Sequence, residues 1–122
     1  MARHLKMLCV DDKADLRDAL AQQFSNEDFD VDTAEDGDIA LQKIIGGNYD
    51  IVLLDIKMPR MDGLTVLQEL KKADKNPYVT MLTGVNEVAI AEECVKMGAK
   101  DFVSKPYDPE ELLHIVIKVL GS

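Results

Sequence analysis

Five residues of this chain have side chains that together could hold a divalent cation and a phosphoryl group. Three are carboxylates, Asp11, Asp12 and Asp55, and two are hydrogen-bond donors, Thr83 and Lys105. Carboxylates that converge repel one another unless a cation neutralises them. An ammonium and a hydroxyl are suitable donors to phosphoryl oxygens. The next question is whether the fold brings these five residues together.

Asp55 stands at an unusual place in the sequence. Five of the six residues from Ile51 to Ile56 are apolar, as in a strand buried on both faces, and Asp55 is the exception. A charge there is costly unless it is paired or binds a metal. Pro59 and Gly63 follow closely, which predicts a shaped loop after the strand.

Short aliphatic runs and helical patterns alternate along the whole chain. Each helical pattern has its own start or stop signal. The second carries Ile39, Leu41, Ile44 and Ile45 before Gly46, the third has Asp62 as its cap, the fourth runs from Asn86 as cap to Met97, and the fifth has Asp108 before Pro109. The predicted strands are Leu5 to Val10, Asp30 to Ala34, Ile51 to Ile56, Tyr78 to Thr83 and Asp101 to Lys105.

This alternation predicts an α/β fold. Short connections between strands that alternate with helices require a parallel sheet, right-handed crossovers and helices on both faces. We expect a doubly wound, flavodoxin-like (βα)5 fold with five parallel strands in the order 2-1-3-4-5, forming a single domain over residues 1–122. In that order the carboxyl ends of strands 1 and 3 are neighbours, so Asp11, Asp12 and Asp55 would meet in one crevice.

Composition excludes several classes of function. The 122 residues carry 14 basic and 23 acidic side chains, a formal net charge of −9, which opposes direct binding to nucleic acid or to an anionic membrane. The apolar stretch near the N-terminus is too short for a signal peptide, so we expect a cytoplasmic protein. Cys9 and Cys94 lack metal-ligand spacing and are expected to be buried thiols.

The chemistry that these residues favour is phosphoryl transfer. A site made of a few oxygen ligands suits Mg²⁺, or Mn²⁺, better than zinc or calcium. A cation, the Lys105 ammonium and the Thr83 hydroxyl would surround a phosphoryl group during its transfer. The chain has no GxxxxGK[ST] nucleotide loop, so we expect one of its own carboxylates to be the acceptor.

Four motifs, in order and on predicted strand ends, resemble the receiver domain of bacterial two-component response regulators, the CheY-like family. They are "VDD" at 10–12, "LLDIKMPRMDG" at 53–63, "MLTG" at 81–84 and "VSKP" at 103–106. The resemblance covers essentially the whole chain. It implies a phosphorylatable signalling switch that is not a turnover enzyme, although it promotes its own phosphorylation and dephosphorylation.

The resemblance also implies a role for each matching residue. Asp55 would be the phosphoacceptor, and Thr83 and Lys105 would contact the phosphoryl oxygens. The metal ligands would be Asp11, largely through water, Asp12, Asp55 and the backbone carbonyl of Lys57. Loop-shaping residues would be Pro59, Gly63, Gly84 and Pro106, with a cis bond between Lys105 and Pro106.

Switching and lifetime are further implications of the resemblance. Thr83 would move toward the phosphoryl group, and Phe102 would turn inward to fill the gap. The family often has tyrosine at this position. Phe102 can bury its ring in the same way, but it has no hydroxyl to offer to a partner. Lys57 and Val85 stand where side chains influence the access of water, and we expect them to slow self-dephosphorylation.

The implied phosphodonor is a histidine kinase or a histidine phosphotransfer protein. The output would be a change in the surface of the fourth helix, fifth strand and fifth helix, roughly Asn86 to Leu120. Sequence leaves open the downstream partner, a missing effector domain, and a homodimer that forms on phosphorylation.

Three other functions are alternatives to a phosphorylatable switch. A metal-dependent aspartyl-phosphate phosphohydrolase usually has a second acid two residues after its nucleophile, where this chain has Lys57. A flavin carrier needs a Ser/Thr/Gly-rich phosphate loop where this chain has "DDKAD". A receiver-like binding module that works without phosphorylation remains the third alternative.

Overall fold

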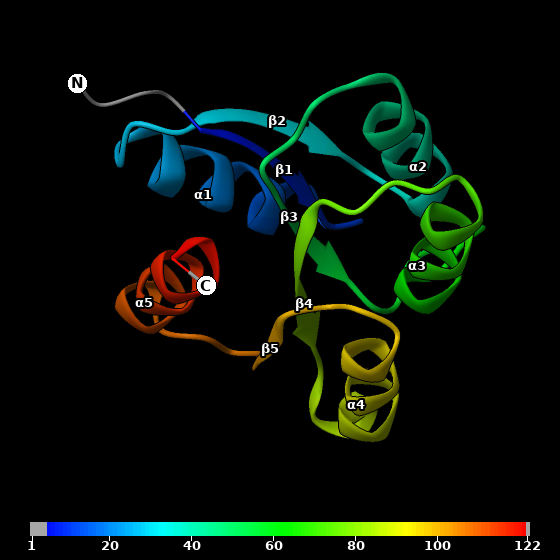
Figure 1. Cartoon of the computed structure of the whole chain (residues 1–122). Coiled ribbons are helices and arrows are strands. Elements are labelled where there is room, and N and C mark those ends of the chain that lie inside the picture. The colour runs from blue at the N-terminus through cyan, green and yellow to red at the C-terminus, as the bar shows by residue number, and fades with distance from the viewer. Residues whose placement is uncertain (1–4, 122) are drawn as a thin grey trace.

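The computed structural model of the chain describes residues 5–121 and shows alternating strands and helices (Figure 1). Alternation of this kind was predicted from the two hydrophobic periodicities of the sequence. The elements are β1 (Lys6–Val10), α1 (Ala14–Ser25), β2 (Asp30–Ala34), α2 (Gly37–Gly46), β3 (Ile51–Asp55), α3 (Gly63–Lys72), β4 (Tyr78–Thr83), the 3-10 turn η1 (Val85–Glu87), α4 (Val88–Lys96), β5 (Asp101–Ser104) and α5 (Pro109–Leu120).

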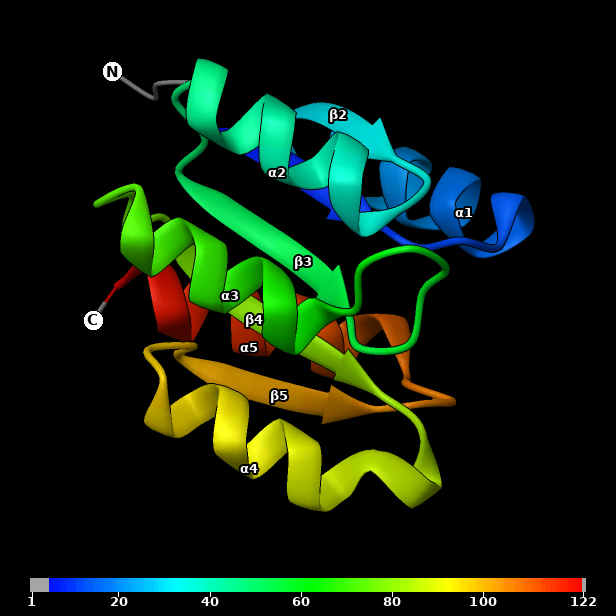
Figure 2. The ribbon, with the colours of Figure 1, turned by 90° about the vertical axis from the view of Figure 1, so that its right-hand side faces the viewer.

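All five strands are parallel and their order is β2-β1-β3-β4-β5, as predicted. Figure 2 shows the sheet with the carboxyl ends of the strands pointing the same way. Val10 of β1 pairs with Leu54 of β3, so the residues that follow these strands emerge side by side. The strand order reverses at this point, and ligands of doubly wound folds bind there.

Two apolar layers cover the two faces of the sheet. Helices α2, α3 and α4 pack on one face through residues such as Ile44, Leu70 and Cys94. Helices α1 and α5 pack on the other face through residues such as Phe24 and Val116. β3 is fully buried at all five positions because both layers cover it, which explains its continuous apolar sequence. Cys9 and Cys94 are buried free thiols, as expected.

Several helix boundaries follow from side-chain caps. The carboxylate of Asp62 accepts a hydrogen bond from the Thr65 amide at 2.8 Å, so Asp62 caps α3 as predicted. Asp108 caps α5, with Pro109 in its first turn. Asp36, which the sequence reading did not single out, caps α2 by accepting from the Ile39 amide. Each of these bonds pairs an amide that the helix itself leaves unsatisfied.

Several boundary or burial predictions were wrong in detail. β1 begins at Lys6, one residue after the predicted Leu5, and α4 ends at Lys96, one residue before the predicted Met97. β3 ends at Asp55, so Ile56 lies just outside the strand, and β5 ends at Ser104, one residue before Lys105. Asn86 does not cap α4, because the chain first makes the 3-10 turn η1 and the helix begins at Val88. Ile45 was predicted to face the core, but 43% of it is exposed.

Between residues 5 and 121, none of the helices combines the length and the apolar character that a bilayer crossing requires.

Candidate functional site

Three aspartates from two neighbouring strands converge at the carboxyl edge of the sheet. Asp11 and Asp12 directly follow β1, and Asp55 is the last residue of β3. One carboxylate oxygen from each of the three lies within 4.8 Å of the others. Asp11 and Asp55 are buried, whereas Asp12 is exposed, so the cluster opens to solvent on one side. The predicted convergence is confirmed.

Lys105 reaches this cluster from the far side of β4. Its ammonium lies 3.1 Å from a carboxylate oxygen of Asp11 and 3.3 Å from one of Asp55. The Lys105 amide donates to the Thr83 carbonyl at 2.7 Å, which ties the segment after β5 to the end of β4. The peptide bond between Lys105 and Pro106 is cis, as the resemblance implies. The site therefore contains three carboxylates and the ammonium group of Lys105.

Burial and mutual repulsion shape the titration of this cluster. Burial is the main reason that the pKa of Asp55 is raised to about 6; Lys105 opposes the increase, and the Asp11 carboxylate adds to it. Burial alone would lower the pKa of Lys105, but the carboxylates of Asp55 and Asp11 outweigh it and raise that pKa. The ammonium therefore stays charged, and in the metal-free protein Asp55 is mostly ionised at neutral pH.

Thr83 ends β4 and is fully buried. Its hydroxyl donates to the carbonyl oxygen of the next residue, Gly84, at 3.1 Å. The amide of Gly84 in turn donates to the Glu87 carboxylate at 2.9 Å. Thr83 thus lies at the same edge of the sheet as Asp55. Its hydroxyl is hydrogen-bonded to the backbone of the loop that follows β4.

Glu87 connects this loop to the loop after β3. Besides accepting from Gly84, its carboxylate lies 3.9 Å from the Lys57 ammonium, and the Glu87 side chain is only 12% exposed. The sequence reading missed Glu87. The available signal was its position three residues after Gly84, the spacing at which a carboxylate can accept a hydrogen bond from the start of a helical turn.

Asp11 is held by groups from the first helix, which the sequence reading also missed. Its carboxylate accepts from the Lys13 amide at 2.9 Å, and the guanidinium of Arg17 donates to its backbone carbonyl at 2.9 Å. Burial, with the negative charge of Asp11 as the next cause, raises the pKa of Tyr107 to about 12. No local sequence pattern distinguishes Arg17 or Tyr107, because the bond of Arg17 to the Asp11 carbonyl and the burial of Tyr107 depend on tertiary structure.

The loop after β3 passes very close to the strand end. The Gly63 amide donates to the Ile56 carbonyl at 2.8 Å, and a Cβ atom on Gly63 would lie 2.6 Å from the carbonyl oxygen of Asp55. A side chain therefore cannot fit at position 63. Lys57 and Pro59 are exposed in the same loop, and the Lys57 side chain extends toward Glu87.

Phe102 lies in the middle of β5, opposite Met81 of β4. Its ring is partly buried and packs against the apolar layer of α2, α3 and α4. The amide of Phe102 donates to the side chain of Asp101 at 2.8 Å. Phe102 therefore lies on the strand next to that of Thr83, two residues before Ser104, which pairs with Thr83.

The donor set of the cluster fits a hard divalent cation. All three side chains of Asp11, Asp12 and Asp55 offer carboxylate oxygens, and no thiol or imidazole belongs to the group. Oxygen ligands of this kind suit Mg²⁺, which keeps part of its water shell when few protein ligands are available. The arrangement can hold a cation beside a carboxylate that Lys105 also contacts.

Known proteins resemble this chain in sequence. Residues 7–117 match the family model described as the response regulator receiver domain. The chain is 36% identical over 108 residues to the transcriptional regulatory protein ResD of Bacillus subtilis, a match that covers 88% of this chain and 45% of ResD. It is 33% identical over 117 residues to the chemotaxis protein CheY of the same organism, covering 95% of this chain and 98% of CheY. The chain spans less than half of ResD and a quarter of the regulatory protein AtoC of Escherichia coli.

Solved structures resemble it as well. The receiver domain of NtrX from Brucella abortus is 35% identical and superposes with a TM-score of 0.88, covering 95% of this chain and 98% of that one. The receiver domain of the Francisella response regulator 1452 is 30% identical with a TM-score of 0.89, covering 97% and 98%. With its strand order, its carboxylate cluster and these matches, the chain belongs to the response regulator receiver domains, the signalling switches of two-component systems.

Proposed function

We propose that Asp55 is the phosphoacceptor of this receiver domain and that Lys105 stabilises the transferred group. The observation that carries the proposal is the 3.3 Å contact between the Lys105 ammonium and the Asp55 carboxylate. Asp55 is buried and its ion-pair partner is one ammonium, that of Lys105, so one of its oxygens can act as a nucleophile while the ammonium remains close by.

The transfer is a displacement at phosphorus. An oxygen of Asp55 attacks the phosphorus atom of a phosphohistidine, the new oxygen–phosphorus bond forms, and the nitrogen–phosphorus bond breaks with its electron pair returning to the imidazole of the donor. The donor belongs to a histidine kinase or a histidine phosphotransfer protein, which is the class of partner that receiver domains have. Lys105 then pairs with a phosphoryl oxygen in place of the free carboxylate oxygen.

We assign the divalent site to Asp11, Asp12 and Asp55, with the backbone carbonyl of Lys57 as a fourth ligand, and Mg²⁺ as the cation, with Mn²⁺ as a substitute. When bound, the cation neutralises charge on the carboxylates and on the transferred phosphoryl oxygens. Asp11 keeps its orientation because the Lys13 amide and the Arg17 guanidinium hold it, and its role is largely through water. Asp12 is exposed and available as a direct ligand.

The switch that we propose uses Thr83 and Phe102. The Thr83 hydroxyl leaves the Gly84 carbonyl and donates to a phosphoryl oxygen, and the Phe102 ring moves into the space that Thr83 vacates. Pro59, Gly63, Gly84 and Pro106 shape the loops around the site. The surface made by α4, β5 and α5 changes as a result and carries the signal to a downstream protein, to an effector domain elsewhere in a longer chain, or to a second copy in a homodimer.

Kinship with response regulators supports a cytoplasmic location and a single receiver domain over residues 1–122, whose ends at 1–4 and 122 lie outside the described residues. We infer that this domain does not itself bind nucleic acid or membranes, since its net charge is −9. It acts as a switch and not as a turnover enzyme.

Intact mass after incubation with acetyl phosphate tests the proposal. One added phosphoryl group that requires Mg²⁺ and is absent from Asp55→Asn is the expected result. Continuous release of phosphate without an adduct would instead favour the phosphohydrolase. Neither adduct nor release would favour a receiver-like module that signals without phosphorylation.

A further inference from the structure

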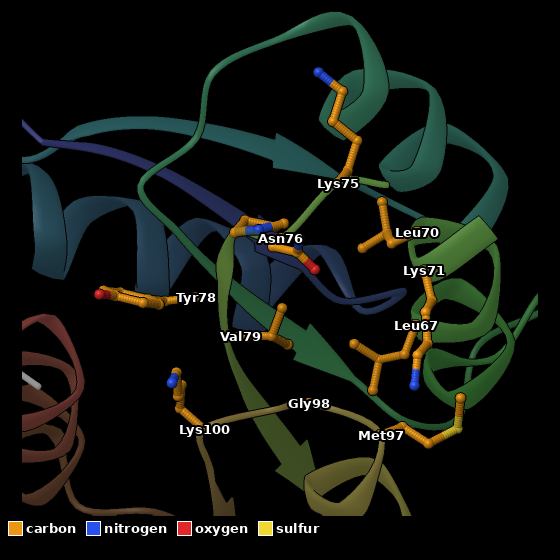
Figure 3. Close-up of a pocket in the computed structure, with 11 residues that line it drawn as sticks. Leu67, Leu70, Lys71, Lys75, Asn76, Tyr78, Val79, Met97, Gly98 and Lys100 are labelled. Atoms are coloured by element: carbon orange, nitrogen blue, oxygen red, sulfur yellow. The ribbon is translucent and has the colours of Figure 1, made fainter. Parts of the chain in front are cut away.

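A hollow lies at the opposite end of the strands from Asp55. It is bounded by the end of α3, the start of β4 and the turn after α4, and its volume is about 290 Å³ (Figure 3). Apolar side chains of Leu67, Leu70, Val79 and Met97 line it. Because β4 begins at Tyr78 beside this hollow and ends at Thr83 beside the carboxylates, the length of the sheet separates the two sites.

The charge of this hollow is opposite to that of the whole protein. Three lysines, Lys71, Lys75 and Lys100, are among its lining residues, and no aspartate or glutamate is. Within residues 5–121, Lys71 and Lys75 have no ion-pair partner. The Lys100 ammonium lies 5.4 Å from the centre of the Tyr78 ring. In a chain of net charge −9, this hollow is a local positive surface with an apolar interior.

Figure 3 shows Lys71 beside Leu67 and Met97, and Lys100 on the other side of Val79. Lys75 extends away from the apolar residues at the rim. A ligand that enters the hollow would therefore meet apolar side chains at its centre and ammonium groups at its edges. This arrangement suits a large apolar side chain flanked by carboxylates.

The hollow continues into shallower depressions on both sides. One shares Lys71 and Met97 with it. Another shares Asn76, Pro77 and Tyr78 and reaches Leu5, Asp50 and Leu120. Asp50 is an acid at this far end of the groove, away from Lys71, and its carboxylate accepts a hydrogen bond from the Lys6 amide at 2.8 Å. Together they form a groove along the amino edge of the sheet. The central volume is at the lower limit for a small-molecule site, whereas a groove of this length accommodates an extended chain.

We propose that this groove, the amino-edge groove, binds an acidic segment of a partner protein. One large apolar side chain of the segment enters the central hollow, and its carboxylates pair with Lys71 and Lys100. Nucleic acid fits less well, because a long polyanion would also meet the acidic surface around this small positive area. The groove lies far from Asp55, so the proposal does not depend on the phosphorylation chemistry.

Amide chemical shifts of the ¹⁵N-labelled full chain test this proposal directly. The probes are short peptides with several Asp and Glu residues around a single Leu, Phe or Met. We expect saturable shifts confined to residues 71–79 and 97–100. Replacing the apolar residue by Ser, or the acids by Lys, should abolish them. The double variant Lys71→Glu with Lys100→Glu should bind about tenfold more weakly, because two attractions become repulsions.

Lys13→Glu is the control matched to the single variant Lys71→Glu, since each reverses one exposed charge; Lys13 lies at the opposite edge of the sheet, and Lys13→Glu should leave peptide binding unchanged. The absence of shifts with every peptide at millimolar concentration overturns the proposal. Equal weakening by Lys13→Glu also overturns it, because binding would then follow net charge alone. Tighter binding of inorganic pyrophosphate at the same amides would assign the groove to a small anion. Self-association that Lys71→Glu abolishes would assign it to a second copy of the chain.

Discussion

Asp55 ends β3 and Lys105 directly follows β5, two strands that are not neighbours, yet their side chains are in contact. β4 lies between β3 and β5, and the Lys105 ammonium crosses its end to within 3.3 Å of the Asp55 carboxylate. The same ammonium lies 3.1 Å from Asp11, so a single cation holds two buried carboxylates. A phosphoryl group on Asp55 would change the partners of Lys105 and, through the Lys105 amide bonded to the Thr83 carbonyl, the strands around it.

The raised pKa of Asp55 predicts a pH-dependent cost to stability in the metal-free protein. Its pKa of about 6 exceeds its ordinary value of 3.8, so the folded state binds a proton more tightly than the unfolded state. This group therefore destabilises the protein at pH 7, and the destabilisation disappears as the pH falls through 6 toward 4. We expect Asp55→Asn to raise the free energy of unfolding at pH 7 by on the order of 1 kcal/mol, with a smaller gain at pH 5.

Urea unfolding in the presence of EDTA at pH 7 and pH 5 measures this difference. Asp12→Asn is the comparison, because it removes one of the charges that raise the pKa of Asp55 and leaves the Asp55 carboxylate in place, so its gain at pH 7 should be smaller than that of Asp55→Asn. An Asp55→Asn variant that is less stable than the wild type at pH 7 would contradict the expected electrostatic cost.

Gly63 should not tolerate a methyl group. A Cβ there would lie 2.6 Å from the Asp55 carbonyl oxygen and 2.9 Å from the Met81 side chain, so Gly63→Ala must push the start of α3 away from β3. We expect a loss of about 1–3 kcal/mol in the free energy of unfolding, together with weaker phosphorylation of Asp55. Gly46→Ala is the matched control, since nothing lies within 4 Å of its added Cβ, and it should be neutral or stabilising. Equal effects of the two substitutions would show that the close approach at Gly63 does not matter.

Thr80 offers a way to stabilise the core. It is fully buried in β4, and among the described residues its hydroxyl is the buried side-chain group without a hydrogen-bond partner. Thr80→Val keeps the shape and removes the unpaired polar group, so we expect a gain of about 1 kcal/mol in the free energy of unfolding by urea. Thr80→Ser, which keeps the hydroxyl and loses the methyl group, should be destabilised. A less stable Thr80→Val would mean that the hydroxyl has a partner, such as buried water.

Lys57 and Val85 should prolong the life of the aspartyl phosphate. The Lys57 side chain extends toward Glu87 from the loop after β3, and Val85 is 80% exposed and has no polar side-chain atom to position water. We expect Lys57→Ala combined with Val85→Gln to speed self-dephosphorylation several-fold, measured as decay of the phosphorylated mass after donor removal. Lys72→Ala is the control, because Lys72 pairs with Glu69 away from the site. Fast decay that neither substitution changes would disprove this role.

Residue patterns predicted the strands, because buried parallel strands leave strong local signals. These signals do not fix the order of the strands. With the expected order 2-1-3-4-5, the convergence of Asp11, Asp12 and Asp55 followed, because the carboxyl ends of parallel strands meet at one edge. The start of α4 was predicted wrongly for a physical reason. Asn86 is a good capping residue, but the chain makes a 3-10 turn in which Glu87 accepts the Gly84 amide instead. Contacts such as Lys57 with Glu87, or Arg17 with the Asp11 carbonyl, join separate elements and have no local pattern.

The most direct test of the central claim locates the acyl phosphate at a single residue. The protein is phosphorylated with acetyl phosphate and Mg²⁺ and treated with borohydride, which reduces an acyl phosphate to an alcohol, and the modified position is identified by tandem mass spectrometry. We predict homoserine at position 55, none at 11 or 12, and far less product in Lys105→Met. Homoserine at position 11 or 12, or none in a protein that has gained a phosphoryl group, would contradict the assignment of Asp55.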